Sequence, residues 1–371
     1  MRADVVEHQL AALARSGHGM AEFAEGALEL LQRAVPFESA CLAFTDPATG
    51  LLTGTVKIQI PDARDAEFAR FEYETDDINK FSEIAGRDVP VGVLALDTEG
   101  RPERSLRFRE FLVPHFDQGN ELRAACRQGG QTWGFLGLYR PTAAAGFSPA
   151  EAAFVAAVES TLAIGIRAGL VADAVHGDAV EAPDGPAVLI VDGQDAIVQA
   201  SSGVVERLEQ MGVDPWRELP ISLASVVSAA RMFAAGRSAT PARSRIRTPS
   251  GTWLVTHASV LTSQTGERGH VVVTIEEARP PEIVPLVVAA FGLTERERDV
   301  VRLVLGGAST QEIAAELFLS PYTVQDHLKS IFVKAGVSSR RELLARVFFE
   351  QYAPRIGGGL APDGWFATPQ G

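Results

Sequence analysis

The stretch "ASTQEIAAELFLSPYTVQDHLKSIFVKAG", residues 308–336, decides the fold of the C-terminal part of this chain. Ser309 precedes an apolar periodic segment and is followed three residues later by Glu312, which is a capping box. Ser320 followed by Pro321 marks a second helix start, and Gly336 stands where a helix ends. The pattern predicts helices over 310–317 and 321–335. Because only three residues separate them, we expect the tight joint of a helix-turn-helix.

The flanking residues extend this unit to four helices. Capping boxes at Thr294 and Ser339, with glutamates at 297 and 342, predict helices over 295–305 and 340–352, and Gly306-Gly307 ends the first of these. We therefore predict an all-α tetrahelical domain over residues 288–352. Its core is predicted from apolar spacing to contain Ile313, Ala314, Leu317, Val324, Leu328 and Ile331.

Residues 293–347, "LTERERDVVRLVLGGASTQEIAAELFLSPYTVQDHLKSIFVKAGVSSRRELLARV", resemble the LuxR-type helix-turn-helix of bacterial transcription regulators. The positions that carry the resemblance are Leu293, Thr294, Arg296, Glu297, Gly307, Ser309, Glu312, Ile313, Ala314, Leu317, Ser320, Thr323, Val324, His327, Ile331, Lys334, Gly336, Val337 and Arg340. The resemblance covers about 55 residues. It implies a domain that binds double-stranded DNA and usually dimerises through its last helix.

The candidate DNA-binding residues lie at the start of the helix predicted over 310–317, on the outer face of the helix predicted over 321–335, and in the basic segment that follows. They are Ser309, Thr310, Tyr322, Thr323, Gln325, Asp326, Lys329, Lys334, Arg340 and Arg341. Gln325 stands where this motif usually has a lysine, and a glutamine can pair bidentately with adenine. Asp326 has two open interpretations, an acceptor for cytosine N4 or a solvated acid favoured by the helix dipole. Phosphate contacts are assigned to Lys329, Lys334, Arg340 and Arg341.

The last predicted helix carries an apolar stripe of Leu343, Leu344, Val347 and Phe348. Part of this stripe must cover the small core. The remainder is predicted to form a two-fold dimer seam, which implies DNA half-sites about one helical turn apart.

Net charge supports a localised rather than a general nucleic-acid surface. The 371-residue chain carries 34 Lys and Arg against 47 Asp and Glu, a net charge of -13. Residues 291–350 hold equal numbers of acidic and basic side chains, so the excess negative charge lies elsewhere. An acidic chain argues against DNA binding over its whole surface.

Residues 1–175 read as an α+β domain. A helix over 6–33, two hairpins with turns at Pro47–Gly50 and Gln128–Gln131, and a helix capped by Ser148 and Glu151 that runs to about residue 175 are expected. This order of elements, with "WGFLGLYRP" and "FSPAEAAFVAAVESTLAIGI", resembles a GAF-type sensor domain. The resemblance carries no diagnostic ligand residue.

Residues 185–277 are predicted to form a second α+β domain. "AVLIVD" resembles the first strand of a phosphoacceptor receiver domain, but a turn at Asp192–Asp195 leads straight into a second strand, and no lysine occurs between Lys80 and Lys329. Aspartyl phosphorylation is therefore not expected, and the pattern resembles a PAS-type domain instead. The tail, residues 353–371, is rich in Gly and Pro and is predicted to be disordered.

Catalytic and metal sites are not predicted. The sequence has no GxxxxGK[ST], HExxH or GxSxG motif, and Cys41 and Cys126 show no CxxC spacing. We expect these two cysteines to be small buried hydrophobes rather than a thiol sensor. A polar cluster of Asp76, Asp77, Asn79 and Lys80 could line a pocket, but a solvated helix face is favoured. The cofactor, if any, is unknown.

The sequence as a whole predicts a cytoplasmic, homodimeric transcription regulator that is not an enzyme and does not contact a membrane. Its GAF-like domain is expected to bind a small-molecule ligand. Two alternatives remain, a scaffold that acts through protein–protein contacts and, with less weight, a GAF-domain enzyme.

Overall fold

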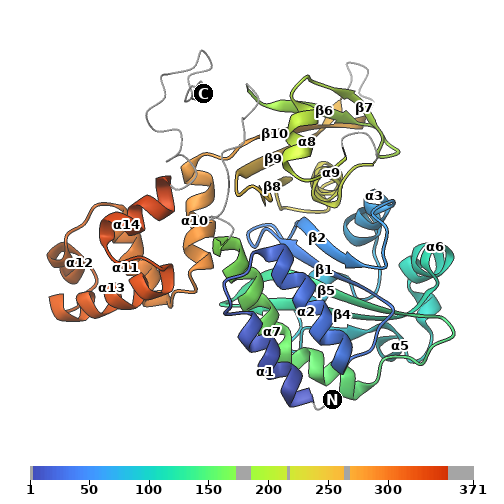
Figure 1. Ribbon diagram of the computed structural model, residues 1–371. Helices are drawn as coiled ribbons and strands as arrows, with labels where there is room; N and C mark the ends of the chain where they lie inside the picture. The colour runs from blue at the N-terminus through green and yellow to red at the C-terminus, as the bar shows by residue number, and fades with distance from the viewer. Residues whose placement is uncertain (1–2, 173–184, 215–217, 263–267, 350–371) are drawn as a thin grey trace.

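The computed structural model describes residues 3–172, 185–214, 218–262 and 268–349. Figure 1 shows two sheet-bearing units stacked on each other and a small helical unit to one side of them. The tail predicted to be disordered, residues 353–371, lies outside the described residues.

The first unit is built on a five-stranded antiparallel sheet in the order β2-β1-β5-β4-β3. Its strands are β1 (Ser39–Thr45), β2 (Leu52–Ile58), β3 (Val91–Val93), β4 (Gln118–Gln128) and β5 (Gln131–Pro141). Both predicted hairpins are confirmed, because β1 pairs with β2 and β4 pairs with β5.

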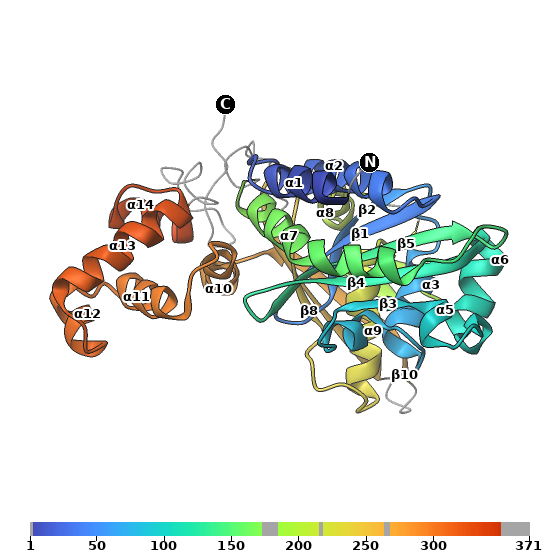
Figure 2. The ribbon, with the colours of Figure 1, turned by 90° about the horizontal axis from the view of Figure 1, so that it is seen from below.

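Three helices cover one face of this sheet: α1 (Ala3–Leu13), α2 (Met20–Ala34) and α7 (Pro149–Ala172) (Figure 2). The single helix predicted over 6–33 is wrong, because the chain breaks at Gly17, whose φ is 79°, and restarts after Gly19. The predicted start of α7 is confirmed, since Ser148 Oγ accepts from the Glu151 N–H at 3.3 Å and the Glu151 carboxylate accepts from the Ser148 N–H.

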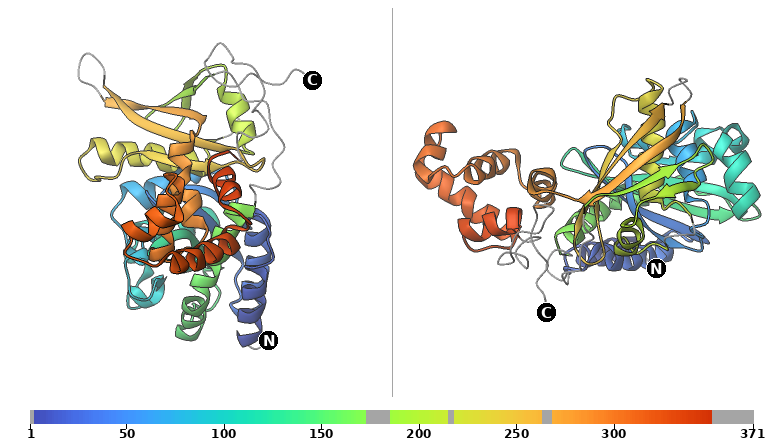
Figure 3. Two further views of the ribbon diagram at one scale, coloured as in Figure 1. Left: turned by 90° about the vertical axis from the view of Figure 1, so that its left-hand side faces the viewer. Right: turned by 90° about the horizontal axis from the view of Figure 1, so that it is seen from above.

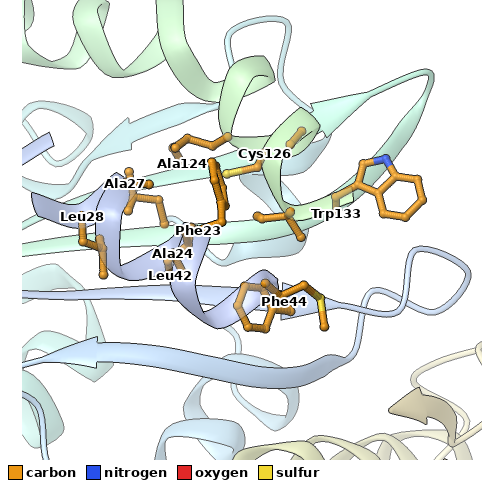
Figure 4. Close-up of a cluster of buried hydrophobic side chains, with 14 of the residues drawn as sticks. Phe23, Ala24, Ala27, Leu28, Leu42, Phe44, Ala124, Cys126 and Trp133 are labelled. Carbon is orange, nitrogen blue, oxygen red and sulfur yellow. The ribbon is translucent and has the colours of Figure 1, made fainter. Parts of the chain in front are cut away.

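α7 is long and apolar enough to cross a membrane, but the core helices of soluble proteins can have the same length and composition. Its buried side packs on β4 and α2. A Cβ on Gly165 would lie 2.0 Å from the ring of Phe23, so glycine is required for the close approach of α2 to α7. Figure 4 shows Phe23, Ala24 and Leu28 of α2 facing Leu42 and other apolar side chains of the sheet. This packing identifies α7 as a core helix.

The opposite face of the sheet is covered by short segments. They are α3 (Asp65–Ala69), η1 (Arg70–Glu74), α4 (Phe81–Ala85), α5 (Leu94–Asp97), η2 (Pro102–Arg104), η3 (Phe108–Leu112) and α6 (Val113–Phe116). They surround a second group of buried side chains, which includes Ala43, Phe81 and Phe135. The sheet is therefore buried on both faces.

The second unit has the same strand order, β7-β6-β10-β9-β8. Its elements are β6 (Ala187–Val191), β7 (Ile197–Ala200), α8 (Val204–Gln210), α9 (Ile221–Ala234), β8 (Arg243–Arg247), β9 (Trp253–Thr262) and β10 (Arg268–Glu277). β6 pairs antiparallel with β7, so the predicted strand-turn-strand is confirmed. Helix α9 was not anticipated from the sequence.

The two sheet-bearing units are joined by ion pairs and by α9. Arg245 of β8 donates through Nε to Asp46 Oδ2 at 2.8 Å, and Arg231 of α9 lies 3.1 Å from the carboxylate of Glu74. Asp46 is 2% exposed, so its charge is shielded from water. α9 contacts β9 of its own sheet and β2 of the other. The two units therefore share buried surface.

The helical unit begins after α10 (Pro280–Ala290), which links it to the rest. It contains α11 (Glu295–Leu305), α12 (Thr310–Glu316), α13 (Pro321–Ala335), α14 (Arg340–Leu344) and η5 (Ala345–Phe349). All six predicted core residues, Ile313, Ala314, Leu317, Val324, Leu328 and Ile331, are buried. The right view in Figure 3 shows this unit standing to one side of both sheets, and in the left view it lies in front of them.

Candidate functional site

Helices α12 and α13 form the predicted tight joint. Ser320 caps α13, because its Oγ accepts from the Thr323 N–H at 3.0 Å, and Gly336 ends it with a φ of 64°. The predicted capping boxes at Thr294 and Ser309 are both complete. The box predicted at Ser339 is only half formed, since the Glu342 carboxylate accepts from the Ser338 N–H instead.

A buried glutamate fastens α13 to α11. Glu297 is 4% exposed and accepts from Ser330 Oγ and Lys334 Nζ, each at 2.6 Å, and from the Thr294 N–H at 2.7 Å. Burial alone would raise its pKa, but the hydrogen bonds from Lys334 and Ser330 outweigh that effect and lower the pKa from 4.5 to about 2. The ammonium of Lys334, predicted to contact phosphate, therefore has a carboxylate partner inside the domain.

Thr310 is the meeting point of three helices. Its Oγ1 accepts from Gln325 Nε2 at 3.3 Å and from Arg340 Nη2 at 3.0 Å. Arg340 also donates to the backbone oxygen of Ala308 at 2.8 Å. The structure thus brings together Ser309, Thr310, Gln325 and Arg340 at the N-terminal end of α12. Arg340 holds this end in place as well as carrying charge.

The outer face of α13 is open to solvent. Tyr322 is 75% exposed, Gln325 is exposed, and Asp326 pairs with Lys329 at 3.4 Å across one helical turn. Arg341 is also exposed, on the following helix. Figure 2 shows α12 and the adjoining end of α13 farthest from both sheets. The N-terminal end of α13, the part that enters the major groove in helix-turn-helix proteins, is therefore unobstructed by the other residues that the structure describes.

Residues 292–347 match the family model of bacterial regulatory proteins of the luxR family. The chain is 40% identical over 55 residues to the spore germination protein GerE of Bacillus subtilis, and the match covers 74% of that protein and 15% of this chain. This chain belongs to the LuxR family. The transcriptional regulatory protein UhpA of Escherichia coli is 48% identical over 56 residues, which are 29% of that protein.

The LuxR-family match is confined to the C-terminal domain. A helix-turn-helix transcriptional regulator of Mycobacterium bovis is 54% identical over 52 residues, but these are 14% of this chain and only 6% of that protein. A solved complex of Vibrio VqmA with ligand and DNA is 17% identical, with a TM-score of 0.24, over 44% of this chain and 83% of that one. A TM-score this low does not establish an equivalent arrangement of domains.

The apolar stripe on the last helix of the LuxR-type domain has two parts, one buried in the domain's core and one left partly exposed. Leu343 and Val347 are buried in the domain's own core, so they are not available to a dimer seam. Leu344 and Phe348 are half-buried and remain as the candidate seam residues. In this structure η5 contacts α10, which therefore covers part of the surface that was predicted to dimerise.

Helix α10 is apolar on both sides. Ile283 and Leu286 belong to the core shared with α7, whereas Val284 and Val288 pack against the core of the LuxR-type domain. At the end of α10, the guanidinium of Arg167 lies so close to Gly292 that a Cβ there would be 2.6 Å from it. The LuxR-type domain is thus attached to the sheet-bearing units through α10 and α7.

A cavity of about 50 Å³ lies on the first sheet, on the face opposite α2 and α7. Its lining includes five aromatic side chains, Phe68, Phe81, Phe111, Phe116 and Tyr139. An ion pair between Lys57 and Asp65 forms part of the wall, and Ile221 of α9 contributes from the second unit. Ligand sites are commonly apolar, with a few fixed polar groups, and occur at domain interfaces.

The two cysteines lie on this sheet. Cys126 is buried among apolar side chains, and Cys41 lines the cavity. Burial raises the pKa of the Cys41 thiol to about 12, so the thiolate is scarce near neutral pH. The expectation of a buried cysteine is confirmed for Cys126, whereas Cys41 is half-buried.

The polar cluster at residues 76–80 is not a solvated helix face, which corrects the expectation from the sequence. Asn79 is fully buried, and the carboxylate of Asp77 accepts from Ser105 Oγ at 2.9 Å and from the Arg107 N–H at 2.8 Å. Asp76 faces solvent beside Arg237, which follows α9. The cluster anchors the segments that cover the cavity.

A buried ionic network under the cavity was missed from the sequence. Arg123 of β4 donates to Glu72 and Glu121, each at 2.8 Å, and Arg107 donates to Glu121 at 2.7 Å. Carboxylates raise the pKa of Arg123 although its burial opposes this, and the same arginines lower the pKa of Glu121. The Arg123 guanidinium stacks 4.2 Å from the ring of Phe81, which lines the cavity.

Proposed function

We propose that this chain is a transcription regulator that binds double-stranded DNA as a homodimer in the cytoplasm. The observation that carries the proposal is the unobstructed N-terminal end of α13 within a LuxR-type helix-turn-helix. Basic side chains that follow α13 supply positioning contacts to phosphate, and Gln325 faces the groove. The proposal assigns no catalytic step to the chain and no membrane contact.

Selection of genomic DNA fragments by the purified protein tests this proposal. We expect enrichment of a near-palindromic site, with affinity that falls log-linearly as salt rises. Failure to enrich any sequence, with or without cell extract, contradicts it. The even charge balance of the LuxR-type domain favours one alternative, a scaffold that contacts protein, and that alternative predicts a weak salt dependence.

Replacing Gln325 with alanine is expected to relax base preference at one position of each half-site. A bidentate glutamine–adenine contact contributes roughly 1 to 3 kcal/mol of discrimination. The salt dependence should stay nearly unchanged, because no charge is removed. Binding to a library of single-base variants of the selected site measures both effects. Uniform weakening across the library would show that Gln325 does not read a base.

We further propose that the two sheet-bearing units are GAF-like and PAS-like sensor domains, and that the cavity on the first sheet, which measures about 50 Å³ in this structure, widens to hold a small-molecule ligand. The aromatic lining, the fixed Lys57–Asp65 pair and the contribution of Ile221 support this site. Because Ile221 belongs to α9, an occupant would contact both sensor domains. Mass spectrometry of small molecules released from the native protein tests for such a ligand.

Helix α10 is the proposed connection between the sensor domains and DNA binding. Replacing Val284 with aspartate should separate η5 from α10 without changing the face of α10 that packs on α7. We expect Leu344 and Phe348 to become more accessible and the dimer fraction in sedimentation equilibrium to rise several-fold. The exposed Pro281 of the same helix, replaced by alanine, is the control. An unchanged dimer fraction would remove α10 from the mechanism.

A further inference from the structure

Phe318 is the most exposed large hydrophobic residue that the structure describes. It lies in the joint between α12 and α13 and is 95% exposed, whereas Leu317 before it is buried and Leu319 after it is half-buried. Leu317 and Leu319 thus pack against the core, whereas the ring of Phe318 is exposed to solvent. The ring therefore contributes nothing to the packing of the domain.

The backbone at Phe318 is also unfavourable for a bulky residue. Its φ is 55°, in the left-handed region. The Leu319 N–H donates to the Ala314 oxygen at 2.9 Å and the Phe318 N–H donates to the Ala315 oxygen at 3.3 Å, which is a Schellman end to α12. Glycine is the residue that occupies this position without strain. A bulky aromatic therefore costs stability here and gains no buried contact in return.

A strained and exposed aromatic residue is explained if its ring contacts another molecule. Phe318 precedes the cap residue Ser320 by two positions, and Tyr322 on the first turn of α13 is 75% exposed. Both rings lie at the end of α13 that enters the major groove in this type of motif. The 5-methyl group of thymine is the apolar group that base edges present there.

We propose that Phe318 contacts DNA at the edge of each half-site and reads a thymine through its methyl group. This inference rests on the proposed DNA-binding function. It adds an apolar contact to an interface whose other candidate residues are polar, charged or phenolic. It also explains why the joint keeps phenylalanine at a position where glycine would be more stable.

The test compares Phe318→Gly with the wild-type full-length protein on a duplex selected by the wild type. We expect the thermal midpoint of the LuxR-type domain to rise by about 2 to 4 °C, because the strain is removed. Affinity for the duplex should fall roughly 5- to 10-fold. Opposite signs for stability and binding distinguish a contact residue from a folding residue. Phe233→Ala, an exposed aromatic in the second sheet-bearing unit, is the control and should change neither quantity.

Uracil in place of thymine removes only the methyl group and identifies the base. Scanning single replacements through the duplex should weaken wild-type binding roughly 4-fold at one position per half-site, and should have no effect at that position on Phe318→Gly. Equal sensitivity of both proteins, or unchanged affinity of Phe318→Gly, would overturn the inference. Loss of promoter activity with unchanged DNA affinity would also overturn it and would assign the ring to a protein partner. If the wild type selects no duplex, the proposed function itself fails.

Discussion

Replacing Glu297 with glutamine is expected to lower the free energy of unfolding of the LuxR-type domain by about 3 kcal/mol. The buried carboxylate accepts from Thr294, Ser330 and Lys334, and its pKa is lowered from 4.5 to about 2. A difference of this size corresponds to about 3 kcal/mol of stability near neutral pH. Glutamine keeps the shape but loses the charge, so the Lys334 ammonium is left without its partner.

Hydrogen exchange of the α11 and α13 amides in the full-length protein measures this effect locally. Glu295→Gln is the matched control, because Glu295 is an exposed acid at the start of the same helix. We expect it to change stability by less than about 0.5 kcal/mol. Equal protection in the two variants would show that the Glu297 contacts do not hold the helices together.

The same carboxylate makes the domain sensitive to acid. Its folded-state pKa lies below its unfolded value, so its contribution is complete above pH 4.5 and is lost as pH falls toward about 2. The wild type should therefore lose more stability across this window than Glu297→Gln does. Parallel losses of exchange protection in both proteins would contradict the assigned pKa.

The helices of the LuxR-type domain could be predicted closely because their ends are set by local chemistry. Ser320 caps α13 through an amide three residues away, and Gly336 ends α13 with its own backbone angle. Such signals are complete within four or five residues of sequence. The prediction of one helix over 6–33 was wrong because the apolar spacing continues through Gly17, whereas the helical backbone ends there.

The cavity and its supports could not be predicted, because their partners lie far apart in the sequence. Arg123 pairs with Glu72 and stacks on Phe81, and Asp77 receives hydrogen bonds from residues 105 to 107. No spacing rule relates these positions, so isolated charges in short helices resembled an ordinary solvated surface. The ion pair of Lys334 could not be predicted either, because its partner Glu297 lies on another helix. The sequence was enough to identify the class of the C-terminal domain, whereas the partners of buried charges could be identified only from the three-dimensional structure.

Replacing Arg123 with methionine is expected to have the largest effect on the first sheet-bearing unit, a loss of about 3 to 5 kcal/mol of stability. Arg123 is fully buried and neutralises the carboxylates of Glu72 and Glu121. Methionine fills a similar volume but leaves Glu121 with Arg107 and leaves the buried Glu72 carboxylate with the Phe81 N–H in place of an ion pair. Removing one partner of a buried network is costly because the remaining charges are already desolvated.

Chemical denaturation measures the loss, followed by the fluorescence of Trp133, which is buried in this unit, in a protein whose three other tryptophans are replaced by phenylalanine. Arg101→Met is the control, because Arg101 is exposed and pairs only with an exposed glutamate among the residues described. Adding Glu72→Gln to Arg123→Met should recover part of the lost stability, since it removes one stranded charge. Recovery would establish that the penalty is electrostatic. A further loss would instead place the cost in packing against Phe81. In that case the supports of the cavity depend on the shape of Arg123 rather than on its charge.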